Sequence, residues 1–227
     1  MTLVLYFHPL ASFCHKVLMA LYETDTAFMG KVVDLMDEGS SATYLDMWPI
    51  GKIPLLHDTE RNRTVPETTI IIEYLDRHYP GPRALLPKDE QACLDARLWD
   101  RFFDLYVQVP MQKIVTDRLR PDGEHDARGV ADARAALTTA YGMIDRHMAD
   151  KTWAIGETFS IADCAAAPAL FYALTVAPVS ETQPNVAAYF ERLLGRSSFK
   201  RVIDEARPYF HMFPFEEAIP ARFLASR

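Results

Sequence analysis

The sequence predicts a protein of two domains, an α/β domain over residues 1–80 and an all-helical domain over residues 88–227. Short runs of strand-forming residues alternate with helical periodicity in the first part, whereas no convincing strand pattern follows residue 88. Pro80-Gly81-Pro82 stops a helix between the two parts and is typical of a linker. A chain of 227 residues is long enough for two small domains.

The first domain is expected to follow the order strand, helix, strand, strand, strand, helix. The expected strands cover residues 3–7, 27–33, 53–58 and 63–65, and the expected helices cover residues 12–22 and 66–79. Residues 37–41 are predicted to form a loop. The first strand–helix–strand connection needs a crossover, so we expect a right-handed βαβ unit.

The second domain is expected to be a set of helices. Helical patterns cover residues 91–111, 127–148, 185–194 and 198–206, and a further apolar helix opens at Ser160. The first of these helices is expected to end or kink near Pro110. The aromatic tail, residues 208–215, is expected to pack back over the body of the protein.

The composition argues against several classes of protein. A net charge of −7 argues against nucleic acid or an anionic membrane as the main partner. No apolar run is long enough to cross a bilayer, and the N-terminal residues do not have the pattern of a signal peptide. Three widely spaced cysteines fit free thiols in a reducing cytoplasm. Neither the cysteines nor the histidines have ligand spacing, so no metal is expected.

The stretch from Trp48 to Leu56 carries the first candidate site. Pro54 begins an apolar run that otherwise predicts a strand, and proline cannot donate a hydrogen bond to a sheet. The main-chain groups of Ile53 are therefore free to pair with an extended ligand, and a cis Ile53–Pro54 bond would hold them toward a groove. An ordinary proline in an edge strand is the alternative interpretation.

Ser12 lies where the first strand meets the first helix. It suits the N-cap of that helix. Alternatively, its hydroxyl donates a hydrogen bond to a thiolate at the helix N-terminus, where a thiol pKa falls from about 8.5 toward neutrality. Cys14 is a second thiol candidate, although its position in the helix fits a buried small hydrophobe better. Tyr6, at the strand end, offers its phenol to the same place.

Glu67 and Thr68 begin another helix and suit a ligand that carries a carboxylate and an ammonium on one carbon. The carboxylate would take the helix N-terminal N–H groups and the Thr68 hydroxyl, and the ammonium would pair with Glu67. With Ile53 and Ser12, this pair describes a site for a peptide-shaped ligand that bears a thiol. By contrast, Ser160-Ile161-Ala162-Asp163 has capping-box spacing, so we expect Asp163 to serve folding and not catalysis.

These residues, in this order, resemble the cytosolic glutathione transferases over nearly the whole chain. The matching pieces are Ser12 with Lys16-Val17, the run from Pro49 to Pro54, Pro66-Glu67-Thr68, and the run from Phe159 to Asp163. The resemblance implies a thioredoxin-like N-terminal domain, a linker and an all-helical C-terminal domain. It also implies glutathione as a co-substrate and a homodimer, in which the N-terminal domain of one chain meets the helical domain of the other.

The same resemblance implies roles for individual residues. The counterpart of Pro54 is cis in the family, and the main chain of Ile53 would pair with the cysteinyl part of glutathione. Glu67 and Thr68 would hold its γ-glutamyl end, and Lys52 looks placed to reach its glycine carboxylate. Ser12 would be the catalytic residue, with Tyr6 as the alternative.

The chain departs from the family pattern at the catalytic position. The usual serine or cysteine falls on Ala11, so either the preceding turn shifts the register or Ser12 acts from the neighbouring position. Ala-Ser-Phe stands where the zeta class carries Ser-Ser-Cys, which weakens the resemblance to a maleylacetoacetate isomerase, and Cys14 lies too late for the cysteine-type classes. Trp48 stands where the family usually has asparagine.

The resemblance therefore implies a bacterial, serine-type-like glutathione S-transferase that conjugates a small hydrophobic electrophile, as in detoxification. The candidate electrophile pocket contains Leu10, Phe102, Tyr106, Pro110, Met111, Phe213 and Phe215. Arg118 and Arg120 either favour an anionic substrate or form a solvated basic turn. The alternatives are a glutathione-dependent isomerase or dehalogenase and a non-catalytic glutathione-binding scaffold.

Overall fold

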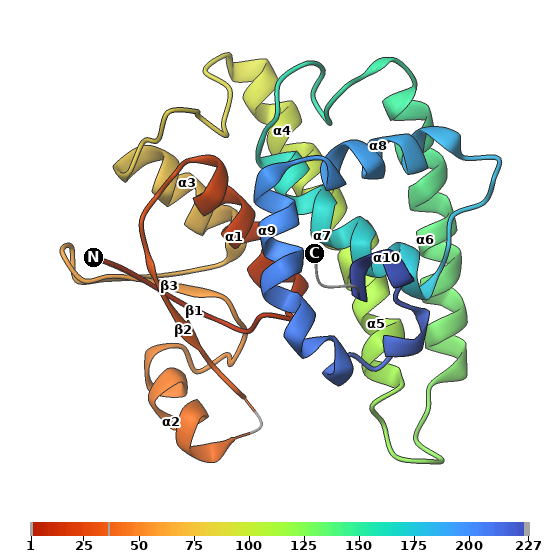
Figure 1. Cartoon of the computed structure of the whole chain (residues 1–227), viewed down its shortest axis with the longest axis horizontal. Helices are drawn as coiled ribbons and strands as arrows, with labels where there is room; N and C mark the ends of the chain where they lie inside the picture. The colour runs from red at the N-terminus through yellow and green to blue at the C-terminus, as the bar shows by residue number, and fades with distance from the viewer. Residues whose placement is uncertain (1, 36, 225–227) are drawn as a thin grey trace. The chain divides into compact units, whose positions relative to one another are not determined.

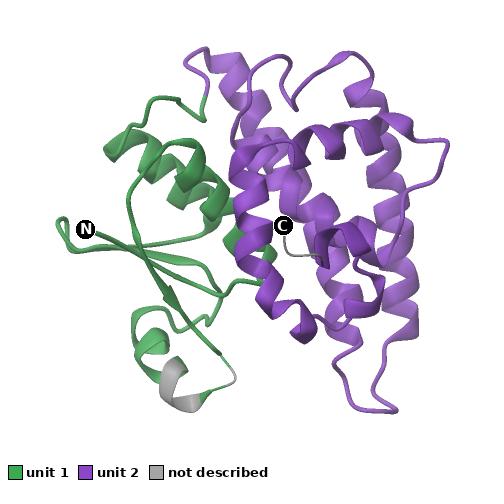
Figure 2. Ribbon diagram, viewed as in Figure 1, with its two compact units in different colours: residues 1–86 green, residues 87–227 purple. Residues whose placement is uncertain are grey.

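A computed structural model describes residues 2–35 and 37–224 of the chain. It contains two compact units, Met1–Leu86 and Pro87–Arg227, which Figure 2 distinguishes by colour. The first unit has a thioredoxin-like architecture, a small mixed sheet with helices, and the second unit is helical. This is the fold class that the sequence predicts.

The first unit is built on a four-stranded sheet in the order β2-β1-β3-β4. Its strands are β1 (Leu3–Phe7), β2 (Met29–Val32), β3 (Leu55–Asp58) and β4 (Arg63–Pro66). β2 pairs with β1 in parallel, as the expected crossover requires, whereas the β1–β3 and β3–β4 pairs are antiparallel. The strand expected over residues 53–58 begins only at Leu55, because cis Pro54 precedes it.

Helices cover both faces of this sheet. They are α1 (Ser12–Glu23), α2 (Glu38–Met47) and α3 (Thr68–His78), with α1 and α3 on one side and α2 on the other (Figure 1). The predicted loop over residues 37–41 was wrong, because α2 already begins at Glu38. Gly39 and the serines after it are weak helix formers, but the buried Tyr44 anchors this helix in a core cluster, and packing overrides propensity.

The second unit contains the remaining helices (Figure 1). They are α4 (Glu90–Phe102), α5 (Val109–Asp117), α6 (Ala127–His147), α7 (Ile161–Val176), α8 (Pro184–Leu194), α9 (Ser197–Ala206) and α10 (Ala221–Leu224). A π-helical segment, Phe103–Gln108, joins α4 to α5. The irregularity expected near Pro110 is present as this π-helical segment directly before α5, but the helix continues past the proline and does not end there.

Helix α7 is the centre of the second unit, and nearly all of its residues are buried. The aromatic tail packs against it, as expected. The Phe210 ring stacks on Phe171 with centroids 6.0 Å apart, and the Phe213 ring lies 5.2 Å from that of Tyr172. Within the described ranges, no helix is both long enough and apolar enough to span a membrane.

Candidate functional site

The three segments singled out in the first unit lie at one end of its sheet. Tyr6, near the end of β1, is paired with Leu55 at the start of β3, and Leu55 is paired with Pro66 at the end of β4. Directly paired residues of antiparallel strands lie about 5 Å apart. The turn into α1, the Ile53–Pro54 peptide and the residues Glu67 and Thr68 therefore lie at the same end of the sheet.

The start of α1 has donors that its own side chains do not use. Ala11 is the N-cap residue and makes no side-chain cap hydrogen bond, so the interpretation of Ser12 as N-cap was wrong. Ser12 is instead the first residue of the helix and is 5% exposed. The Ala11 carbonyl accepts from the N–H groups of Cys14 and His15, at 2.8 and 3.1 Å. Cys14 is the first residue whose N–H donates to this carbonyl. The N–H groups of Ser12 and Phe13 precede it in the first turn, where a helix leaves its donors unsatisfied.

Two buried residues follow on the same helix. Burial raises the pKa of the Cys14 thiol to about 12, and a hydrogen bond with the His8 main chain opposes this only in part. Cys14 is thus a buried small hydrophobe and not a reactive thiol. Burial also lowers the pKa of His15 to about 4, and the ring Nε2 lies 2.5 Å from the Pro9 carbonyl oxygen.

The Ile53–Pro54 peptide is cis, as the resemblance implies. Ile53 precedes the first paired residue of β3, so its main-chain groups lie beyond the ladder. The preceding Lys52 is exposed, and its carbonyl accepts a hydrogen bond from the Tyr44 hydroxyl. Trp48 packs with Ile53 against the buried cluster around Tyr44, which gives the residue at the usual asparagine position a packing role.

The start of α3 is strained and also lacks a side-chain cap. Glu67 is the N-cap residue at φ 68° and ψ 120°, a conformation that costs a non-glycine residue about 1–3 kcal/mol. Strain of this kind concentrates at ligand sites. Thr68 is buried, and the next residue, Thr69, accepts a hydrogen bond from the Lys16 ammonium at 3.1 Å, which ties α3 to α1.

Tyr6 lies among other partners. Its ring packs against the buried cluster of Val33, Tyr44 and Leu55, with a centroid distance of 6.1 Å to Tyr44. The Lys31 ammonium lies 5.2 Å from the centroid of the same ring. The ring therefore belongs to the α2 side of the sheet, whereas Ser12 begins a helix on the other side (Figure 1).

The second unit carries an apolar groove of about 490 Å³ between α4 with its π-helical extension and α6. It is lined by Leu98, Phe102, Tyr106, Ala136, Thr139, Ala140 and Met143. The groove brings together two of the predicted pocket residues, Phe102 and Tyr106. Met111 and Phe213 are instead buried in the core of this unit, at 3% and 7% exposure.

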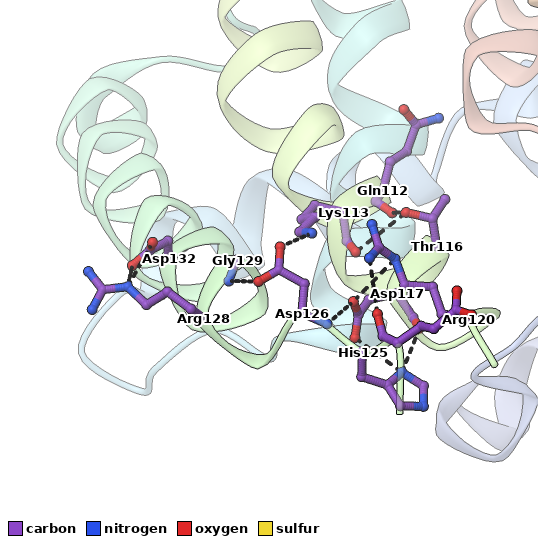
Figure 3. A network of polar contacts seen from close by, with 11 residues as sticks. Gln112, Lys113, Thr116, Asp117, Arg120, His125, Asp126, Arg128, Gly129 and Asp132 are labelled. Carbon is purple, nitrogen blue, oxygen red and sulfur yellow. Dashed lines mark hydrogen bonds and ion pairs between the residues drawn. The ribbon is translucent and has the colours of Figure 1, made fainter. Parts of the chain in front are cut away.

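The basic residues after α5 are already neutralised within the second unit. Arg118 Nη1 donates to Glu217 Oε1 at 2.5 Å, and its guanidinium lies 4.3 Å from the Phe215 ring centroid. Arg120 lies 3.7 Å from a carboxylate oxygen of Asp117, in the polar network drawn in Figure 3. These pairs favour the structural interpretation of the basic turn over an anionic substrate site.

Asp163 is fully occupied by contacts within the second unit. Its carboxylate accepts hydrogen bonds from the Tyr189 hydroxyl at 2.6 Å, from the Ala154 N–H at 2.8 Å and from the Ser160 N–H at 2.8 Å. The Ser160 hydroxyl completes the capping box. Burial raises the pKa of Asp163, and these hydrogen bonds oppose that rise. The predicted folding role is confirmed.

Tyr44 is a residue of this site that the sequence does not mark. No local pattern marks it, because its contact with the Lys52 carbonyl requires the helix and the loop to be folded. The described residues contain no group of three or more side chains with the chemistry and spacing to hold a metal ion.

Comparisons with known proteins give a consistent result. The model described as the glutathione S-transferase N-terminal domain matches residues 5–83, and the C-terminal domain model matches residues 102–197. The chain is 24% identical over 163 residues to glutathione S-transferase GstB of Escherichia coli K12, covering 71% of this chain and 78% of that protein. It is 26% identical to a stringent starvation protein A homolog of Histophilus somni, covering 86% and 87% of the two chains.

Solved structures give the same result. A glutathione S-transferase from Methylobacillus flagellatus KT with glutathione bound matches with a TM-score of 0.80 and 25% identity, over 88% of this chain and 98% of that chain. The transferase URE2P8 of Phanerochaete chrysosporium, with oxidized glutathione, matches with a TM-score of 0.81 over 92% and 97% of the chains. At 19% identity, this second match shows the fold alone.

Proposed function

This chain belongs to the cytosolic glutathione S-transferase family, and from that premise we propose that it binds glutathione in its first unit and transfers the glutathione sulfur to an electrophilic carbon. One observation carries the proposal. The starts of α1 and α3, both without a side-chain cap, meet the cis Ile53–Pro54 peptide at one end of the sheet. This edge offers donors to an extended, thiol-bearing peptide.

We assign each part of glutathione to a segment of this edge. The γ-glutamyl carboxylate takes the N-terminal N–H groups of α3 and the Thr68 hydroxyl, and its ammonium pairs with the Glu67 carboxylate. The main chain of Ile53, beside Pro54, pairs with the cysteinyl residue. The exposed Lys52 reaches the glycine carboxylate. The strained backbone of Glu67 supports this arrangement, because it sets the direction in which α3 begins.

The cysteinyl thiol then lies at the start of α1. The Ser12 hydroxyl and the nearby N–H groups donate to the thiolate, which lowers the pKa of the bound thiol and releases its proton to solvent. The thiolate attacks the electrophilic carbon, so that a carbon–sulfur bond forms while the leaving group departs with its electron pair. The enzyme supplies the thiolate and proximity. The packing of the Tyr6 ring with Tyr44 supports Ser12 over Tyr6 as the donor.

The electrophile is proposed to be small and hydrophobic. The apolar groove in the second unit supports the assignment of Phe102 and Tyr106 to its pocket, since both residues line it and Tyr106 is 57% exposed. Leu10, Met111 and Phe213 stay predictions from the sequence.

The homodimer is proposed from the family, and exposed apolar residues of the second unit support it. Leu94 of α4 is 57% exposed, and Leu105 and Val109, which do not line the groove, are also exposed. Apolar surface of this kind marks contact sites. We also propose a bacterial, serine-type subgroup and a detoxifying role. We further propose a cytoplasmic location, and the three free cysteines support this location.

The test is an ultraviolet difference titration of bound glutathione against pH in the wild type, in Ser12→Ala and in Tyr6→Phe. We expect a bound thiol pKa well below its free value in the wild type and in Tyr6→Phe, and a rise of about one unit in Ser12→Ala. A rise in Tyr6→Phe alone would move the role to Tyr6. Glutathione binding without any thiolate at neutral pH would rule out the transferase proposal.

A non-catalytic glutathione-binding scaffold is the second candidate, and Ala11 favours it. Serine-type and cysteine-type relatives carry the reactive residue at this position, and here Ala11 is the N-cap and has no side-chain donor. The relative from Histophilus somni is named for stringent starvation and not for a transferase. Conjugation of an aryl halide, followed by absorbance in the wild type and in Ser12→Ala, separates the candidates, because only an enzyme loses turnover.

A further inference from the structure

The turn that leads into α1 is held by hydrogen bonds that have no part in the proposed thiol chemistry. The N–H of Ala11 donates to the His8 carbonyl at 3.0 Å, and the N–H of Leu10 donates to His8 Nδ1 at 3.2 Å. Cys14 contacts the His8 main chain from inside the helix. Residues 8–11, which we call the entry turn, are thus fixed at their first residue.

The fully buried His15 holds the other half of the entry turn. Its backbone N–H donates to the Ala11 carbonyl at 3.1 Å, and its ring nitrogen Nε2 lies 2.5 Å from the Pro9 carbonyl oxygen. A carbonyl oxygen only accepts, so Nε2 carries the hydrogen. His15 therefore binds the carbonyls of Pro9 and Ala11, on both sides of Leu10. The second of these residues directly precedes Ser12 in the chain.

The charge of His15 fits a structural hydrogen bond and not proton transfer. Burial lowers its pKa to about 4, the hydrogen bond to the Pro9 carbonyl opposes this, and the neighbouring His8 lowers the pKa further. The imidazole is therefore neutral at the pH at which a glutathione thiolate forms. Its donor stays in place throughout that range.

We propose that His15 is a positioning residue for thiol activation, because its Nε2–H bond to the Pro9 carbonyl fixes the entry turn and thereby aims the Ser12 hydroxyl and the free N–H groups of α1 at the sulfur. The inference rests on the proposed function. A helix N-terminus and a hydroxyl stabilise a thiolate only within hydrogen-bond distance, so a small rotation of the entry turn removes the effect.

The test compares His15→Gln with His15→Asn. The glutamine amide nitrogen lies about as far from the backbone as Nε2 and can donate to the Pro9 carbonyl, whereas the shorter asparagine cannot reach it. Both variants are neutral and polar. We expect His15→Asn to raise the pKa of bound glutathione by about one unit, with about tenfold less thiolate below that pKa, and His15→Gln to change it by less than about 0.3 unit.

His147 provides a matched control. Its Nε2 also binds a backbone carbonyl, that of Ala154, at 2.6 Å, but it belongs to the second unit. His147→Asn should lower the melting temperature without changing the pKa of the bound thiol. If His147→Asn raises that pKa as much as His15→Asn does, general destabilisation explains the effect and the proposal is wrong.

The outcomes separate this inference from the proposed function. No bound thiolate in the wild type would overturn the proposed function and the inference with it. A wild-type thiolate whose pKa is the same in His15→Asn would overturn the inference alone. If neither His15 variant folds, Leu10→Gly loosens the entry turn without opening the core. It is expected to raise the thiol pKa in the same direction, and an unchanged value would overturn the inference.

Discussion

Two helix starts in this chain use similar residues in opposite ways. At the start of α7, the Ser160 hydroxyl accepts from the Ala162 N–H at 3.3 Å, and Asp163 accepts from the Ser160 N–H at 2.8 Å. At the start of α1, the N-cap residue is Ala11, and Ser12 stands one position inside the helix without capping it. The first start satisfies its own donors, and the second leaves them to something else.

The difference teaches how to separate a structural helix start from a binding one. A capping box uses the N-terminal donors within the chain, and it can be buried safely. An uncapped start leaves its donors available, and in this chain two uncapped starts and an unpaired strand end lie at the same end of the sheet.

The largest effect on stability is expected at the capped start of α7. Asp163→Ala leaves the donors of Ala154, Ser160 and Tyr189 buried without an acceptor, so we expect a loss of roughly 3–5 kcal/mol in the free energy of unfolding. Urea unfolding followed by circular dichroism measures it. Tyr189→Phe, which removes only one of these bonds, should cost about 1 kcal/mol. Equal losses in the two variants would contradict a shared network.

The first unit also contains a carboxylate whose hydrogen bonds are all made within the unit. It lies at the end of the sheet opposite the candidate site. Asp58 accepts from the hydroxyls of Tyr79 and Tyr74, at 2.6 and 2.7 Å, and from the N–H groups of Glu60 and Arg61. Burial alone would raise the pKa of Asp58, but these hydrogen bonds lower it from 3.8 to about 2.

This network predicts a pH dependence with a definite sign. Because the folded pKa of Asp58 is lowered, the unfolded chain binds its proton more tightly, and the contribution is complete above about pH 4. It is lost as the pH falls through about 2. Unfolding free energies of the wild type should therefore decrease more steeply than those of Asp58→Asn over this window. Parallel curves for the two proteins would show that Asp58 does not supply the difference.

Local signals in the sequence predicted the capped start of α7 but only part of the candidate site. Ser160 and Asp163 are three residues apart, so their spacing alone predicts the capping box. The positive φ of Glu67 has no such signal, since nothing in the local sequence demands it. The bond from Tyr44 to the Lys52 carbonyl depends on the tertiary fold, because the residues where α2 begins have the pattern of a loop.

Tyr44 supports the candidate site from α2, because its hydroxyl binds the carbonyl of Lys52 beside Ile53. Tyr44→Phe removes the hydroxyl that binds the Lys52 carbonyl and leaves the ring in its cluster, so we expect a loss of about 1 kcal/mol in stability. The loop that presents Ile53 should also become more mobile, which weakens glutathione binding. Calorimetric titration with glutathione measures the affinity. Unchanged affinity would remove Tyr44 from the site.

The smallest effect on stability is expected where the comparison is sharpest, between two serines. Ser160→Ala removes a side-chain cap, which typically costs about 1 kcal/mol. Ser12→Ala removes no cap, so we expect a change below about 0.5 kcal/mol, together with the rise in the pKa of the bound thiol. Thermal unfolding of both variants, with and without glutathione, measures the two effects side by side. If Ser12→Ala destabilises the free protein as much as Ser160→Ala does, the two helix starts are alike after all. A stable Ser12→Ala that binds glutathione without forming its thiolate would separate the roles of the two serines, because one residue then serves the fold and the other serves the ligand.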